Sequence, residues 1–197
     1  MKNINIKNKA KWVRGFTLIE LLVSTSIFVM IMLSAMGSLF VLLNAAKNSR
    51  ALRFSIDNVN FAMESMTRSI RMGTNYYCLD DGKIQMDEFL DETNDCKDGG
   101  KFVAFIPQEV KGFRIGYMWA KRDDGSGTKT VKRCSLDGCV EIVSSNVNVE
   151  NLRFFVNGAD LSDNRQASVY IIMKGTVMVK ETPIPFYLQT MASMRNF

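Results

Sequence analysis

A single carboxylate, Glu20, lies inside a long apolar run near the start of the chain. Residues 21–46 contain no ionisable side chain, and these 26 positions exceed the roughly 20 residues that a helix needs to cross a bilayer. Glu20 therefore lies at or inside the hydrocarbon boundary, where a carboxylate costs about 2.5–3.5 kcal/mol on insertion scales. A charge held at that cost is expected to have a function and a cationic partner.

The residues before this run predict its orientation. Residues 1–15 carry no acidic side chain and five basic ones, Lys2, Lys7, Lys9, Lys11 and Arg14. The positive-inside rule then keeps this end in the cytoplasm and places the remainder outside. The whole chain has 25 Lys and Arg against 20 Asp and Glu, so subtracting the five leaves 20 against 20. The positive charge is therefore a topological feature and does not indicate nucleic-acid binding.

The segment Gly15-Phe16-Thr17-Leu18-Ile19-Glu20-Leu21-Leu22-Val23 resembles the type III signal of type IV pilins and type II secretion pseudopilins. The resemblance implies that a prepilin peptidase cleaves between Gly15 and Phe16, on the cytoplasmic side, and that the new amine of Phe16 is N-methylated. It also implies that Glu20, the fifth residue after cleavage, meets that amine within or between subunits as the apolar helices bundle into a filament. Such a pair sets register more reliably than it adds stability. The alternative is an unprocessed anchor in which Glu20 reaches the membrane interface.

Four cysteines, Cys78, Cys96, Cys134 and Cys139, all follow the apolar run. Four cysteines allow three pairings, and the sequence cannot choose among them. Proximity favours Cys78 with Cys96 and Cys134 with Cys139. An even number of cysteines in an exported region favours disulfides, whereas the spacings are poor for zinc and the chain has no histidine to help.

Enzymatic activity is not expected, because the absence of histidine removes the usual general base and the imidazole-dependent triads. The segment Gly125-Ser126-Gly127-Thr128-Lys129-Thr130 lacks the spacing of a phosphate loop and is interpreted as a hairpin turn. Asp87, Glu88, Asp91 and Glu92 are weak candidates for a calcium site. They do not match an EF-hand, so a solvated acidic surface is the better interpretation, and no cofactor is predicted.

A basic cluster later in the chain is a candidate DNA-binding surface. Its members are Lys121, Arg122, Lys129, Lys132 and Arg133, with Asp123 and Asp124 among them. The cluster could contact a phosphate backbone if the filament took up DNA. A solvated hairpin is the preferred interpretation, because no pattern for stacking single-stranded bases adjoins it.

The elements that must position these residues begin with one long helix, from about Phe16 to Met72. Its outer half carries an apolar stripe at spacings of three and four, Leu52, Ile56, Val59, Met63, Met66 and Ile70. We interpret this stripe as a spine for a sheet and not as a coiled-coil seam, because it lasts under three heptads. Gly73 is expected to stop the helix.

The segment after the helix is expected to form antiparallel strands. Candidates are 102–106, 113–120, 130–134, 140–143, 147–156, 168–179 and 186–194, which are rich in β-branched and aromatic residues. The fold class is therefore α+β, with a long helix packed on a C-terminal antiparallel sheet. The expected parts are a leader (1–15), a transmembrane or filament-core helix (16–46), an amphipathic helix (47–73) and a strand-rich head (74–197).

These features predict a minor pilin or pseudopilin, similar to J-type pseudopilins and W-type minor pilins, that enters an initiating tip complex. The expected partners are other pilins, bound through the N-terminal helix, the prepilin peptidase and the inner-membrane assembly platform. The expected location is the inner membrane with the head outside, and after assembly a periplasmic or extracellular filament. Two alternatives stay open: a competence or adhesive pilin that binds DNA or surfaces, and an unprocessed membrane-anchored binding domain or enzyme.

Overall fold

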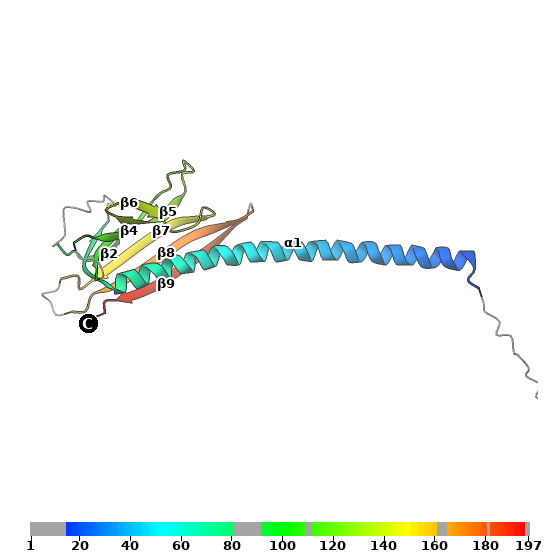
Figure 1. Ribbon diagram of the computed structural model, residues 1–197, viewed down its shortest axis with the longest axis horizontal. Coiled ribbons are helices and arrows are strands. Elements are labelled where there is room, and N and C mark those ends of the chain that lie inside the picture. Colours follow the sequence, from blue (N-terminus) through cyan, green and yellow to red (C-terminus); the bar gives the residue numbers. More distant parts are fainter. Residues whose placement is uncertain (1–14, 81–91, 109–111, 161–164, 181, 196–197) are drawn as a thin grey trace, which may run out of the picture. The chain divides into compact units, whose positions relative to one another are not determined.

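The computed structural model describes residues 15–80, 92–108, 112–160, 165–180 and 182–195 (Figure 1). The chain divides into two compact units, with the boundary between Lys47 and Asn48. One helix, α1 (Leu18–Arg71), supplies the described helical part of the first unit and the beginning of the second. All nine described strands belong to the second unit.

These strands form two antiparallel sheets. They are β1 (Gly73–Leu79), β2 (Cys96–Gly100), β3 (Phe102–Pro107), β4 (Ile115–Lys121), β5 (Lys129–Ser135), β6 (Gly138–Glu141), β7 (Val147–Asn157), β8 (Ser168–Val179) and β9 (Thr182–Ser193). One sheet has the strand order β1-β3-β4-β5-β6, and the other has the order β2-β7-β8-β9. This architecture confirms the predicted α+β class.

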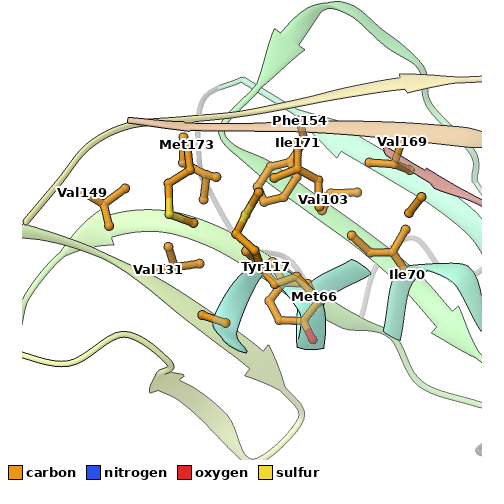
Figure 2. Close-up of a cluster of buried hydrophobic side chains, with 14 of the residues drawn as sticks. Met66, Ile70, Val103, Tyr117, Val131, Val149, Phe154, Val169, Ile171 and Met173 are labelled. Atoms are coloured by element: carbon orange, nitrogen blue, oxygen red, sulfur yellow. The ribbon is translucent and has the colours of Figure 1, made fainter. Parts of the chain in front are cut away.

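The core of the second unit joins α1 to both sheets. Val59, Met63, Met66 and Ile70 of the predicted stripe are buried in one apolar cluster with residues of both sheets, while Leu52 packs against it half-buried. Figure 2 shows Met66 and Ile70 in this cluster with Val103 and Tyr117 of the first sheet and Phe154 of the second. The outer half of the helix is therefore a packing spine, as predicted.

The helix ends at Arg71, one residue before the predicted end. Gly73 is already the first residue of β1, and a Cβ atom placed on it would lie 2.3 Å from Cδ2 of Phe105. Gly73 is thus required because an aromatic ring lies against its backbone. The hydroxyl of Tyr76 lies 2.7 Å from the carbonyl oxygens of both Ile70 and Gly73, so its one proton is shared by a carbonyl of the last helical turn and one of β1.

The end of the described chain also contacts the end of α1. The backbone N–H of Arg195, just beyond β9, donates to the carbonyl oxygen of Arg71 at 3.1 Å. Ala192 of β9 is buried in the same cluster as Val59 and Ile70. The first and last elements of the second unit therefore share one core.

Seven strands lie where the sequence predicted them, with shifts at their ends. The prediction missed β1 and β2. The segment Gly125–Gly127 forms the tip of the β4–β5 hairpin, with φ values of +74° and +72° at its two glycines. The interpretation of this segment as a turn is confirmed.

Candidate functional site

The N-terminal end of α1 carries the candidate processing and assembly residues. Gly15, Phe16 and Thr17 precede the helix, and Phe16 is 76% exposed. The hydroxyl oxygen of Thr17 accepts the backbone N–H of Glu20 at 3.3 Å, and its carbonyl accepts the N–H of Leu21 at 3.1 Å. Thr17 is thus the N-cap of the helix.

Glu20 is the third residue of α1, so Thr17 and Glu20 have the Thr-x-x-Glu spacing of a capping box. This relationship was not predicted, although the Thr-x-x-Glu spacing alone indicates it. A carboxylate in the first turn also interacts favourably with the positive end of the helix dipole. Glu20 at this position is therefore favourable for the N-terminal turn of α1.

The described helix beyond Glu20 has an apolar, exposed surface. Residues 18–46 are all exposed, and α1 contains a window with a mean hydropathy of 2.4, long and apolar enough to cross a membrane. The hydroxyls of Ser24, Thr25, Ser26 and Ser34 donate to carbonyls of their own helix at 2.8 to 3.1 Å. Such polar groups are satisfied without water, as a bilayer or a helix bundle requires.

Both disulfides that proximity favoured are present. Cys78–Cys96 joins β1 to β2 and therefore links the two sheets covalently. Cys134–Cys139 joins directly opposed residues of β5 and β6. Cys78 and Cys134 are fully buried.

Of the four weak calcium candidates, Asp87, Glu88 and Asp91 lie outside the described residues. Glu92 is described, and its backbone carbonyl accepts the guanidinium of Arg114. Within the described ranges no group of three or more His, Cys, Asp or Glu side chains could hold a metal.

Two neighbouring acids bind protein groups. Asp80 forms ion pairs with Lys101 at 3.3 Å and Arg153 at 2.7 Å, and the hydrogen bond from Lys101 is the main cause that lowers the pKa of Asp80. The carboxylate of Asp95 accepts the N–H groups of Gly158 and Ala159 at 3.3 and 2.9 Å. These two carboxylates therefore hold loops and strands together.

The interpretation of the basic cluster as a solvated hairpin is wrong for two of its members. Arg122 is 7% exposed and forms an ion pair with Glu141; its guanidinium also donates to the carbonyls of Ser144 and Val147 at 2.7 and 2.8 Å. The two terminal nitrogens of the guanidinium thus have partners, while its buried Nε has no hydrogen-bond partner among the described residues.

Lys132 is likewise 7% exposed, and its Nζ lies 2.6 Å from Asp123. The Nζ of Lys129 lies 3.9 Å from the centre of the Trp119 ring, within the range of a cation–π contact. Lys121 and Arg133 are exposed. Three of the five cations thus have partners inside the fold, which weakens the case for a phosphate-binding surface.

Residues 13–36 match the family model described as the prokaryotic N-terminal methylation motif. This match covers the capped start of α1 and most of its apolar part. Together with the long apolar helix it is consistent with the type IV pilin and pseudopilin family, which confirms the resemblance for this segment. The search of curated proteins and the search of solved structures found no match.

Proposed function

We propose that this protein is a minor pilin or pseudopilin subunit, cleaved between Gly15 and Phe16, methylated on the amine of Phe16 and assembled through residues 16–46. The observation that carries the proposal is Glu20. It is a lone carboxylate in the first turn of an exposed apolar helix, inside a segment that matches the methylation motif. A new amine at Phe16 supplies the cation that a carboxylate at this depth requires.

In this function the apolar helix stays in the inner membrane until assembly, with the head outside, and then packs against other pilins. The head supplies surfaces for partners, as expected of an initiating tip complex. The protein has no enzymatic role in this proposal. A DNA-binding role is less favoured, because Arg122 and Lys132 are buried in ion pairs.

The processing step is tested by mass spectrometry of the full-length protein isolated from its native membrane. In cells with an active prepilin peptidase, the N-terminal peptide should begin at N-methylated Phe16. In matched cells without the peptidase, it should retain residues 1–15. Retention of residues 1–15 in both strains would contradict the proposal and favour an unprocessed anchor.

The assembly step is tested separately with Glu20→Gln, which removes the charge and keeps the shape. This variant should be inserted and cleaved normally but should enter filaments at least about tenfold less, a loss equivalent to about 1.4 kcal/mol. Ser34→Ala, in the same apolar helix, is the matched control and should assemble normally. Normal incorporation of Glu20→Gln would show that the carboxylate does not take part in assembly.

A further inference from the structure

The free edge of the four-stranded sheet is the feature from which we draw a further inference. β9 is the last strand in the order β2-β7-β8-β9 and pairs with β8 over its full length. Figure 1 shows β9, in red, beside the C-terminal part of α1. Residues of both elements line one groove, so α1 and β9 are neighbours in space.

Two prolines show which backbone groups of β9 point away from the sheet. The register of β8 and β9 is continuous from Ser168↔Ser193 to Val179↔Thr182, so alternate residues face alternate sides. Pro183 and Pro185 have no N–H to give to β8, and proline is found within sheets where that position faces outward. The N–H and carbonyl groups of Tyr187, Gln189 and Met191, in phase with the prolines, therefore face the free edge.

This edge lacks most of the protection that natural sheets give to an unpaired strand. Charged side chains, bulges and short length are the usual devices. β9 has 12 residues, no charged side chain and no shift of register. Its two prolines protect only the beginning, and just beyond its end the N–H of Arg195 already donates to the carbonyl of Arg71. Residues 187–191 between them are open to another strand.

Receptive surfaces lie on both faces of this open segment. On the inner face a groove of about 270 Å³ lies between α1 and β9, and Met63, Thr67, Leu188 and Thr190 contribute to its walls. On the outer face Tyr187 and Met191 are 60% and 47% exposed. Alternate side chains of an added strand would thus meet a groove on one face and an aromatic and thioether surface on the other.

The charge at one end of the groove indicates the partner's chemistry. Beyond the C-terminal end of β9 a second, larger depression is lined by three arginines and one glutamate, Arg68, Arg71, Arg195 and Glu64. Glu64 pairs with Arg68 at 3.2 Å. Arg71 adds a further positive charge beside this pair, and this charge favours an acidic side chain on the partner at this end.

We propose that β9 binds an extended segment of a partner protein as an additional strand. The segment has uncharged side chains beside residues 187–191 and an acidic residue beside Arg71. This inference concerns the folded second unit and does not rest on processing or on the role of Glu20. It specifies how the head would recognise a partner.

The test uses the full-length chain in its native cells, with a benzophenone amino acid in place of Tyr187 as the photo-crosslinking probe. We expect an adduct with a partner protein, and we expect Gln189→Pro to lower its yield about tenfold, because the substitution removes one outward N–H and adds a ring at the edge. Gln189→Ala is the matched control, since it keeps that N–H, and should retain the yield within about twofold.

Thr190→Lys provides a second variant that leaves every backbone N–H in place. It puts a charge into the groove and should also lower the adduct yield about tenfold. This variant decides the question if Gln189→Pro fails to form both disulfides. Arg71→Glu should lower the yield about threefold and Arg71→Lys should not, which tests the charge assignment.

Three outcomes would overturn the proposal. They are no adduct at position 187, an adduct whose yield is the same in Gln189→Pro and Thr190→Lys as in the parent, and an adduct composed of two copies of this chain. Normal removal of residues 1–15 in the same cells would show that such a failure concerns β9 alone. Conversely, an edge-dependent adduct on an unprocessed chain would support β9 and contradict the proposed processing.

Discussion

The hydroxyl oxygen of Tyr76 lies 2.7 Å from the carbonyl oxygen of Ile70 in the last turn of α1. The same hydroxyl lies 2.7 Å from the carbonyl of Gly73, and the Tyr76 side chain is fully buried. The single proton of this phenol is thus shared between a carbonyl at the end of the helix and one at the start of β1. Because a buried carbonyl without a donor is costly, this contact couples the spine to the first sheet.

Tyr76→Phe should therefore destabilise the head by about 1–3 kcal/mol, since it removes the donor and keeps the ring. The measurement is the denaturant midpoint of the full-length chain in detergent micelles. Tyr187→Phe is the control, because Tyr187 is 60% exposed, and it should change the free energy of unfolding by less than about 0.5 kcal/mol. Equal effects of the two substitutions would contradict this role for Tyr76.

Because the phenol of Tyr76 is buried, we also expect the protein to lose stability at alkaline pH. Burial raises the pKa of Tyr76 above the ordinary tyrosine value, which is near 10. The unfolded state therefore loses this proton at lower pH than the folded state does. The contribution of the Tyr76 hydroxyl to the free energy of unfolding is thus complete below about pH 10 and declines as the pH rises further. The free energy of unfolding should fall less steeply for Tyr76→Phe than for the parent between about pH 9 and 11. Parallel curves would show that the phenol does not titrate differently on unfolding.

The ion pair between buried Arg122 and partly exposed Glu141 should be sensitive to loss of either charge. The Arg122 side chain is 4% exposed and that of Glu141 is 28% exposed. Glu141→Gln should cost about 2–3 kcal/mol, somewhat less than for a fully buried pair, because it leaves the arginine without its counterion. The exposed pair of Glu64 and Arg68 is the control, and Glu64→Gln should cost less than about 0.5 kcal/mol. Thermal unfolding of the three proteins compares these effects.

Gly73→Ala tests whether this glycine is required by the Phe105 ring. The added methyl group would lie 2.3 Å from Cδ2 of that ring, so the substitution should cost about 1–3 kcal/mol. Phe105→Leu should relieve part of this cost in a double-mutant cycle, with a coupling of at least about 0.5 kcal/mol. Strict additivity would instead favour a local role at the helix end.

Substitution of Lys180, in the turn between β8 and β9, should stabilise the protein. Its φ is +57°, a conformation that asparagine and glycine adopt at less cost than lysine. Lys180→Asn should therefore raise the free energy of unfolding by about 0.5–1 kcal/mol, while Lys180→Ala should leave it nearly unchanged. Denaturant titration distinguishes the two, and an equal gain in both would point to charge instead of backbone conformation.

The two disulfides should differ in how much they contribute to the free energy of unfolding. Their sequence separations are 18 and 5 residues, which in the chain-entropy model correspond to about 3 and about 2 kcal/mol. Replacing Cys78 and Cys96 by alanine should lower the unfolding midpoint more than replacing Cys134 and Cys139. The reverse order would show that packing around the bridges outweighs loop closure.

Sequence patterns predicted the strands that are rich in β-branched and aromatic residues. β8 was predicted with its observed limits on that composition, and buried residues alternate along its 12 positions. The prediction started β9 at Phe186, too late, since Pro183 and Pro185 argue against a strand. They are tolerated here because their missing N–H groups face the free edge.

The missed features depend on contacts between residues far apart in the chain. β2 reads Cys-Lys-Asp-Gly-Gly and has no strand-forming side chains. It is a strand because its glycines let other groups approach: a Cβ on Gly100 would lie 2.5 Å from Sγ of Cys78, and one on Gly99 would lie 2.9 Å from the Phe155 ring. Burial of Arg122 was also missed, because its carbonyl partners Ser144 and Val147 are 22 and 25 residues away.

The contact between Arg195 and Arg71 has a consequence for the order of events during biosynthesis. The apolar stripe of α1 precedes every described strand in the sequence, and β9 follows the other eight, so the stripe is synthesised before β9. Since Ala192 and the stripe share one core, that core stays incomplete until β9 has been synthesised, and its apolar side chains need protection until then. In the proposed function the helix at 18–46 can insert while the head is still unfinished. Membrane anchoring would then precede folding of the head, and the nascent head would complete its core while already tethered.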